Sequence, residues 1–437
     1  MSAKRDLPRE YTVDIERLSH EGRGVGRYAG KTVFVADALP GEQVQAKVTR
    51  RHRRYDEAIS LTVLRADSTR VVPRCPHAAL CGGCALQHLE PSAQLQHKQN
   101  VLLELLRHQA HVEPKAVLPP TTGPLWGYRR RARLSVRVVE KKGGVLIGFR
   151  EKSSHFVTDI SECAVLVPSV GERLPALRAL VERLSIKEHI PQIEVAADDT
   201  TTLLLLRHLA PFTAEDLAHL RAFEMDTGLH LYLQDGNVAH SVPVSAPVSL
   251  QYALNDLRFT FQPGDFVQVN AAINHQLVAR ARELLNPTAD DRVLDLFCGL
   301  GNFTLPIAQR AAAVVGYEGE AALVARAQAN AQMNELHNVD FQQADLFSEA
   351  GVARVAAQSF DKILLDPPRS GAEAVLRGLN LTATRRIVYV SCNPVTLARD
   401  TAILTRDRGW QLAAAGVVDM FPHTAHVESI AVFERAR

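Results

Sequence analysis

Two short segments in the last quarter of the chain carry the residues best suited to chemistry. The strand-like run KILL ends at Asp366 in the turn DPPR, and the run IVYV leads into Ser-Cys392-Asn393-Pro394. Prolines can fix the turn so that the acid is aimed at a planar polar group, a device of enzymes that act on flipped bases. Asn393 can cap a helix that Pro394 begins, so we expect the helix end to lower the pKa of the Cys392 thiol. The plain alternatives are a tight turn and a buried structural thiol.

These residues belong to a regular alternation of strand-like and helix-like segments that begins at about residue 266. Five short apolar runs in this region each stop on a reactive residue, namely Asp295, Glu318, Asp345, Asp366 and Cys392. The alternation predicts a parallel, doubly wound α/β sheet of Rossmann-like form, in which ligands gather at the carboxyl ends of the strands. We therefore expect the four acids and the thiol to outline one site.

The first turn of the predicted sheet reads DLFCGLGNF and spans residues 295–303. Its glycines allow the backbone to approach a ligand closely at the start of the next helix. A dinucleotide-binding fold is the rival interpretation, but Thr304 stands where that motif needs a third Gly or Ala. The D-x-F-x-G-x-G form is more typical of S-adenosylmethionine enzymes, and Glu318 is placed to hold two ribose hydroxyls. Cys298 is predicted to be a small residue that fills space.

A ring-holding acid, a methyl donor and a thiolate together suit methylation at carbon 5 of a pyrimidine. That carbon is a poor nucleophile, but attack of Cys392 on carbon 6 would create an enolate while Asp366 hydrogen-bonds the ring. A base must then remove the proton from carbon 5. The segment FPHTAHVES offers Glu428 as this base, with His423 and His426 as alternatives.

Four further cysteines form a separate set. The spacing Cys75-x5-Cys81-x2-Cys84, followed much later by Cys163, is close to the plant-type ferredoxin pattern C-x4-C-x2-C…C. We predict that these four thiolates bind an iron-sulfur cluster. Zinc is the competing occupant, although zinc sites more often use two C-x2-C pairs. Unligated core thiols are the third possibility, but nearby proline and glycine residues supply the turns that a metal-wrapping backbone needs.

The first half of the chain has a different character. Residues 8–66 alternate short strands with glycine turns, which predicts a small antiparallel, OB-like β-barrel. A helix is expected from Ser92 to about residue 110, with Ser92 as its N-cap. The middle third contains strand-like segments with a helix or two between them, which predicts a β-rich α+β domain.

Composition and charge limit the classes of protein that are possible. The chain has 437 residues and a net charge of +2, with basic clusters at 47–54 and 129–133. Such clusters suit a polyanion, although any one of them is more often a solvated surface. No apolar run is long enough to span a bilayer, and the first residues lack a signal-peptide core. We expect a cytoplasmic protein of two or three domains.

The motifs resemble those of the class I RNA uracil-C5 methyltransferases over nearly the whole chain. The resemblance rests on the barrel, which looks like a TRAM domain, on the four-cysteine set and on FVQVN at 266–270, DLFCGLGNF, GYEG, LLDPPRSG, VSCNP and FPHTAHVES. It implies S-adenosyl-L-methionine as the methyl donor, Cys392 as the nucleophile and Glu428 as the base. It further implies that the cysteine set binds a [4Fe-4S] cluster.

The resemblance also implies where the other site residues and the domains lie. The cofactor and substrate sites would be lined by Gln268, Phe297, Asn302, Glu318, Asp345 and Asp366. The expected domains are a TRAM-like barrel at 1–70, a central β-rich domain with the cluster at 71–262 and a Rossmann-like methyltransferase domain at 263–437. The helix from about 92 to 120 is expected to pack on the last of these.

A transfer RNA relative of this family lacks the barrel and the cluster cysteines, so the resemblance favours 23S ribosomal RNA as the substrate of a monomeric enzyme. The target would be a uridine that flips out of a single strand or loop. Two other classes stay open. One is an RNA-binding iron-sulfur protein without catalysis, and the other is a nicotinamide-dependent oxidoreductase that uses the cluster for electrons.

Overall fold

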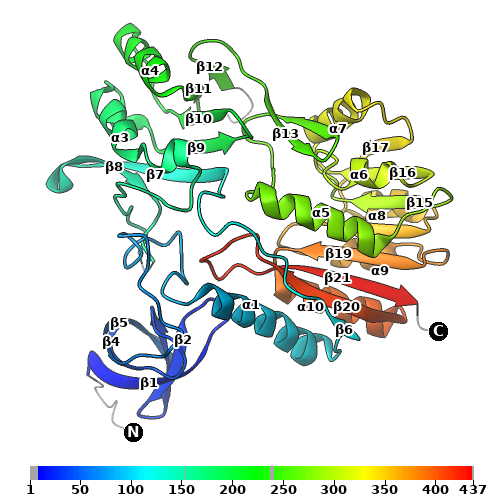
Figure 1. Ribbon diagram of the computed structural model, residues 1–437, viewed down its shortest axis with the longest axis horizontal. Coiled ribbons are helices and arrows are strands. Elements are labelled where there is room, and N and C mark those ends of the chain that lie inside the picture. The colour runs from blue at the N-terminus through cyan, green and yellow to red at the C-terminus, as the bar shows by residue number, and fades with distance from the viewer. Residues whose placement is uncertain (1–7, 153, 237–240, 436–437) are drawn as a thin grey trace.

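The computed structural model describes residues 8–152, 154–236 and 241–435. Figure 1 shows a small barrel near the N-terminus, a central sheet with helices, and a larger sheet that holds the C-terminus. In these described ranges, no helix combines the length and the apolar character needed to cross a membrane.

The N-terminal barrel is closed, as predicted. Its strands are β1 (Glu10–Leu18), β2 (Gly24–Tyr28), β3 (Lys31–Ala36), β4 (Gln43–Arg51) and β5 (Tyr55–Arg65), joined in the order β1-β2-β3-β5-β4. Alternation along β1 turns Tyr11, Val13 and Ile15 into the barrel core. One pairing differs from the antiparallel expectation, because β3 and β5 run parallel.

The central region is a six-stranded sheet in the order β12-β11-β10-β9-β7-β8. Its strands are β7 (Arg131–Val139), β8 (Gly144–Gly148), β9 (Gln192–Ala197), β10 (Thr202–Arg207), β11 (His230–Gln234) and β12 (Ser241–Pro243). Its helices are α2 (Pro168–Gly171), α3 (Leu174–Arg183) and α4 (Ala214–Thr227). Leu177 of α3 and Leu220 of α4 share one buried cluster with Leu134 and Leu204 of the sheet, so both helices cover the sheet.

The largest sheet has the strand order β17-β16-β15-β18-β19-β21-β20-β6. Its strands are β15 (Arg292–Leu296), β16 (Ala313–Glu318), β17 (Val339–Gln343), β18 (Lys362–Leu365), β19 (Arg386–Ser391), β20 (Trp410–Val418), β21 (Glu428–Arg435) and β6 (Ala116–Val117). The first five strands of this order are parallel, as the alternation predicted. Strand β21 lies antiparallel to both β19 and β20, which the alternation alone did not predict.

Helices cover both faces of this sheet (Figure 1). One face packs against α5 (Ala271–Leu285), α6 (Thr304–Ala308) and α7 (Ala321–Met333), and the other against α8 (Glu349–Ala356), α9 (Glu373–Gly378) and α10 (Pro394–Ala402). The hairpin of β13 (Leu250–Leu254) and β14 (Leu257–Phe261) packs on the first face through Leu254 and Phe259. The sheet is therefore buried on both sides, which explains its continuous apolar strands.

A helix from the first third of the chain completes this domain. Helix α1 (Pro91–Leu105) continues into a π-helical turn, Leu106–Ala110, and its buried Leu102 lies in the same cluster as Leu294 and Tyr389 of the large sheet. The predicted N-cap at Ser92 is wrong. The helix begins at Pro91, whose backbone angle is already helical, and Glu90 is therefore the cap residue. The Glu90 side chain makes no capping hydrogen bond.

Candidate active site

The predicted nucleophile, acid and base all come to one edge of the large sheet. Asp366 follows the last residue of β18, and Cys392 follows the last residue of the neighbouring parallel strand β19. Glu428 is the first residue of β21, and because β21 runs antiparallel, Ser429 pairs with Ser391. The amino end of β21 thus meets the carboxyl end of β19, and Glu428 lies near Cys392.

Burial changes the acidity of both carboxyl groups. Only 3 % of Glu428 is exposed, and burial raises its pKa well above the ordinary value. The negative charge of nearby Asp366 raises the pKa of Glu428 further, whereas the Arg369 guanidinium lowers it. Burial also raises the pKa of Asp366 to about 7. The two acids therefore favour a state in which at least one of them keeps its proton at neutral pH.

The expectation of a lowered pKa for the Cys392 thiol is wrong. The helix start is as predicted, since Pro394 begins α10 and the Asn393 side chain accepts a hydrogen bond from the Val395 N–H at 3.1 Å. Burial nevertheless raises the pKa of Cys392 to about 11, and the charges of Glu428 and Asp366 add to this effect. Desolvation and two acidic neighbours therefore outweigh the lowering effect of the nearby Arg369 guanidinium.

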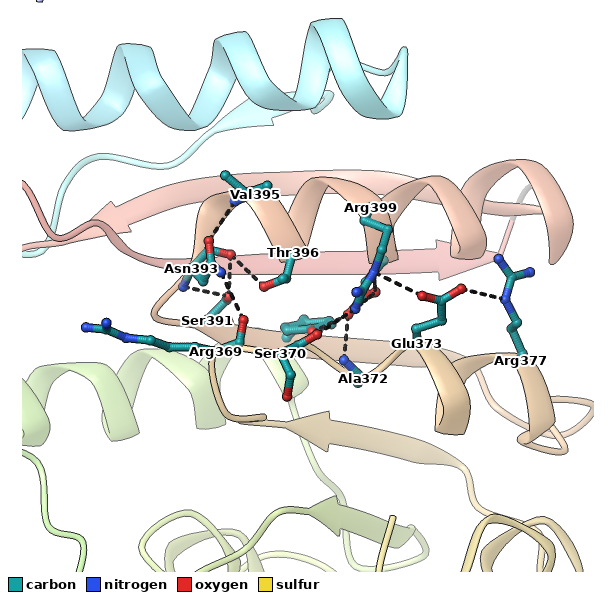
Figure 2. Close-up of polar contacts among 12 residues, drawn as sticks. Arg369, Ser370, Ala372, Glu373, Arg377, Ser391, Asn393, Val395, Thr396 and Arg399 are labelled. Carbon is teal, nitrogen blue, oxygen red and sulfur yellow. Dashed lines mark hydrogen bonds and ion pairs between the residues drawn. The ribbon is translucent and has the colours of Figure 1, made fainter. Parts of the chain in front are cut away.

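The loop after β18 and the loop after β19 are bound to each other (Figure 2). The Asn393 side-chain amide donates a hydrogen bond to the Arg369 carbonyl at 2.9 Å, and the Ser391 hydroxyl donates to the Asn393 carbonyl at 3.1 Å. Arg399 of α10 donates to the Ser370 carbonyl at 2.9 Å. The bonds from Asn393 and Arg399 fix the turn that carries Asp366 relative to the turn that carries Cys392.

The two histidines proposed as alternative bases lie in different places. The His426 ring is within 3.4 Å of the Arg369 guanidinium and lies on a large cavity. The His423 ring stacks on Trp126 at 3.9 Å between centroids, and the His423 N–H donates to the Gln94 side chain of α1. His426 therefore contacts the turn that follows Asp366.

The glycine loop after β15 has a backbone conformation that favours glycine. Gly299 and Gly301 have φ values of 54° and 89°, in the left-handed region that favours glycine. The Gly299 N–H donates to the Glu318 carboxylate at 3.1 Å, so the acid at the end of β16 folds over the loop. Cys298 is buried among apolar side chains, in keeping with its predicted role as a space-filler.

Asp295 lies deep under this loop. One carboxylate oxygen accepts a hydrogen bond from the Thr304 hydroxyl at 2.5 Å, and the other oxygen has no partner within the described residues. Burial raises the pKa of Asp295 to about 7, and the charges of Asp366 and Glu318 contribute to the rise. Thr304 therefore anchors the loop to the strand, and Asp295 electrostatically connects the glycine loop with the Asp366 turn.

The other predicted cofactor residues lie around the same loop. Asn302 exchanges two side-chain hydrogen bonds with Asn274 at 2.9 and 3.0 Å, and it also accepts one from the Tyr252 hydroxyl at 3.0 Å. Gln268 lines a small cavity together with Asn274 and Tyr252. Asn274 and Tyr252 were missed by sequence reasoning, because neither stands in a motif.

The opposite side of the loop is aromatic. Phe297 has a φ of 64°, and its ring lies 5.8 Å from the ring of Phe347. Asp345 accepts a hydrogen bond from the Phe347 N–H at 3.0 Å, and both Asp345 and Phe347 are exposed. Asp345 therefore positions an exposed aromatic ring that sequence reasoning did not single out.

The four cysteines of the predicted cluster line one small cavity, together with Arg129 and Phe149. All four are free thiols, and burial raises the pKa of Cys81 to about 11 and that of Cys84 to about 12. Charge on Cys163 would raise both values further, so a cation among these thiols would relieve their repulsion. In the part of the chain that the structure describes, no three metal-binding side chains gather closely enough for a single metal ion.

A larger cavity of about 860 Å³ lies between the barrel, the segment of residues 75–86 (the cysteine segment) and the central sheet. It reaches His426 at its methyltransferase end and shares Cys84, Arg129 and Phe149 with the cysteine cavity. Its basic lining residues are Arg23, Arg50, Arg129, Arg133, Arg150 and Lys152. Both basic clusters of the sequence therefore contribute to one cavity, whose lining also includes the acidic residues Glu21, Asp37, Glu57 and Glu151.

The raised pKa of Cys392 predicts how this thiol reacts in the free enzyme. Because only the thiolate is nucleophilic, alkylation of Cys392 by iodoacetamide should accelerate about tenfold per pH unit from pH 7 to pH 9. Peptide mass spectrometry can follow Cys392 separately from the other cysteines. A rate that levels off near pH 7 would mean that the thiolate is stabilised, contrary to this account.

Comparisons with known proteins place the chain in a family. A model of the tRNA (Uracil-5-)-methyltransferase family matches residues 91–436, and a TRAM domain model matches residues 5–60.

Two curated relatives cover almost the whole chain. They are both named 23S rRNA (uracil(1939)-C(5))-methyltransferase RlmD. The protein from Alkalilimnicola ehrlichii is 53 % identical over 99 % of this chain and 98 % of its own length. The protein from Xanthomonas oryzae pv. oryzae is 52 % identical over 96 % of each.

A solved structure agrees in fold as well. The tRNA (uracil-54, C5)-methyltransferase of Pyrococcus abyssi, in complex with S-adenosyl-L-homocysteine, is 25 % identical, with a TM-score of 0.74 over 96 % of this chain and 99 % of its own. With a family model that matches most of its length and relatives above 50 % identity, this chain belongs to the tRNA (Uracil-5-)-methyltransferase family, in a form that carries a TRAM barrel.

Proposed function

We propose that this protein transfers a methyl group from S-adenosyl-L-methionine to carbon 5 of a specific uridine in 23S ribosomal RNA. The observation that carries the proposal is the convergence of Asp366, Cys392 and Glu428 at one edge of the sheet. The names of the close relatives support the ribosomal substrate.

In this proposal Cys392 is the nucleophile and Glu428 is the base. Cys392 first loses its thiol proton to water, and the thiolate then adds to carbon 6 of the uracil while the pair of electrons of the 5,6 double bond moves toward carbon 5 and oxygen 4. When bound, S-adenosylmethionine supplies the methyl group to carbon 5, and its sulfur keeps the electron pair of the broken bond. Glu428 in its ionised form then takes the proton of carbon 5, the double bond reforms, and the Cys392 thiolate leaves.

Asp366 would hold the ring during these steps. With a pKa of about 7, its carboxyl group can keep a proton near neutral pH and donate it in a hydrogen bond to the ring oxygen where enolate charge develops. Because the turns after β18 and β19 are bonded to each other, the acid and the thiol would meet the same base in a fixed relation.

The methyl donor would lie over the glycine loop. Glu318 would accept hydrogen bonds from the ribose, Asn302 and Gln268 would lie on one side, and Phe297 and Asp345 on the other. Tyr252, Asn274 and Phe347 support this arrangement because they contact the same residues.

The RNA would enter the cavity of about 860 Å³, whose basic side chains come from the barrel and from the central region. We propose a division of labour in which residues 1–70 and 71–262 grip the RNA and residues 263–437 perform the transfer. The target uridine would leave its stack and enter the site past His426.

We further propose that Cys75, Cys81, Cys84 and Cys163 hold a [4Fe-4S] cluster, since all four line one cavity. The full chain purified without oxygen should then contain iron and sulfide in equal amounts. Cys84→Ser should lose most of both, whereas Cys298→Ser, which changes a buried thiol elsewhere, should retain them. Zinc in place of iron and sulfide would overturn the cluster assignment.

The proposed roles predict the effects of two substitutions. Cys392→Ala should abolish 5-methyluridine at its site in 23S ribosomal RNA, because no nucleophile remains for carbon 6. Glu428→Gln should lower turnover roughly 10²–10⁴-fold, the range expected for loss of a general base. The measurement is mapping of 5-methyluridine in RNA from a deletion strain that expresses each variant.

Glu434→Gln provides a matched control, because Glu434 lies near the opposite end of β21 and pairs with Arg386. This variant should methylate the RNA normally. An unchanged set of methyl marks in the deletion strain would contradict the proposed substrate, and full activity of Cys392→Ala would contradict the covalent mechanism.

A further inference from the structure

The segment between β20 and β21, residues 419–427, ends directly at Glu428. The hydrogen bonds within the segment are short-range. The Thr424 hydroxyl donates to the Phe421 carbonyl at 2.9 Å and accepts a bond from the His426 N–H at 3.2 Å. Contacts with other elements therefore help to set the direction in which the segment delivers Glu428. The His426 ring lies against the Arg369 guanidinium, and Glu428 itself pairs with Val418 of β20, while further bonds hold the first half of the segment.

That first half is held by helix α1. Lys98 has no exposed surface, and its ammonium group donates to the Asp419 carboxylate at 2.7 Å and to the Phe421 carbonyl at 2.9 Å. One turn earlier on the same helix, the buried Gln94 side chain accepts a bond from the His423 N–H at 2.9 Å. Two side chains of α1 thus bond to three successive points of the segment.

The cysteine segment also bonds to His423, from another side. The N–H groups of Ala85 and Leu86 both donate to the His423 carbonyl, at 3.0 and 2.9 Å. The Gln94 amide donates to the Leu86 carbonyl at 3.0 Å, so it joins the helix, the cysteine segment and His423. His423 has a φ of 65°, a left-handed conformation that costs free energy for a residue with a side chain and persists only when the surroundings enforce it.

We propose that Lys98, with Gln94, is a positioning residue that holds segment 419–427 so that Glu428 reaches the proton on carbon 5 of the target uridine. This inference rests on the proposed function of Glu428 as the base. Neither residue touches substrate in this proposal. Each acts only through the segment that it bonds to.

A purely structural role is the competing explanation, because a buried ion pair that loses one partner destabilises any protein. The chain offers a matched control. Lys362, at the amino end of β18 and therefore at the opposite edge of the sheet, is also largely buried and pairs with the buried Asp291 at 2.8 Å. Lys98→Met and Lys362→Met each remove a buried lysine–carboxylate pair, at opposite edges of one sheet, and after the second change Asp291 keeps its other partner, Arg385.

The covalent mechanism provides a readout that stability alone would not change. After methyl transfer, Cys392 cannot be expelled until the proton leaves carbon 5, so an enzyme with a displaced base should accumulate a covalent complex with ordinary RNA. With 5-fluorouridine in the RNA, carbon 5 carries fluorine in place of the proton, and the complex forms without any use of the base. The comparison of the two RNAs therefore separates the base step from the earlier steps.

The experiment uses the full-length enzyme, S-adenosylmethionine and an RNA fragment that contains the target uridine. Lys98→Met should form the 5-fluorouridine complex at nearly the wild-type rate, lose roughly 10²-fold in turnover on ordinary RNA, and accumulate the covalent complex there. Lys362→Met should accumulate no covalent complex. The thermal unfolding midpoints of Lys98→Met and Lys362→Met show how far each substitution destabilises the protein. Gln94→Met should behave like Lys98→Met and provides the test if Lys98→Met does not fold.

The inference is overturned if turnover on ordinary RNA falls equally in Lys98→Met and Lys362→Met. It is equally overturned if formation of the 5-fluorouridine complex falls in parallel with turnover, since the damage would then precede the base step. A wild-type enzyme that forms no complex with 5-fluorouridine RNA would instead overturn the proposed covalent mechanism.

Discussion

Withdrawal of ionisable groups from water is the physical constraint on which the candidate site depends. Asp366, Glu428 and Cys392 are crowded into a part of the protein where burial raises the pKa of each group. Burial therefore favours the protonated form of each of these groups near neutral pH. The same burial makes the position of each group critical, because a misplaced charge has little water to screen it.

The connectivity of the sheet makes this crowding possible. Parallel strands alone bring Asp366 and Cys392 to the edge, but Glu428 arrives only because β21 enters the sheet in the opposite direction. That reversal requires a connecting segment over the edge of the sheet, and α1 and the cysteine segment bond to it. Residues in the first third of the chain therefore help to position residues more than three hundred positions later.

Residue patterns predicted the parts of the structure that depend on local order. The alternation from residue 266 predicted the parallel strands, and strand-end positions predicted where Asp366 and Cys392 would lie. The pattern offered Glu428 as the base and left His423 and His426 as alternatives, because no local sequence pattern indicates that β21 is antiparallel. The roles of these residues stay predictions.

The failures have the same origin. We expected a lowered pKa for Cys392 from the adjacent helix alone. Burial raises this pKa, and Glu428, which is distant in sequence, raises it further. Ser92 was expected to cap a helix that Pro91 begins. Tyr252, Asn274 and Lys98 carry no motif, and their importance follows only from contacts with residues far along the chain.

The most direct test of the account locates the bond that the crowded site is proposed to make. RNA that contains 5-fluorouridine at the target position is incubated with the enzyme and S-adenosylmethionine, the product is digested with protease and nuclease, and the modified peptide is sequenced by tandem mass spectrometry. The account predicts a methylated fluorouridine attached to the sulfur of Cys392. Attachment to another cysteine, or methylated RNA without any attachment, would contradict it.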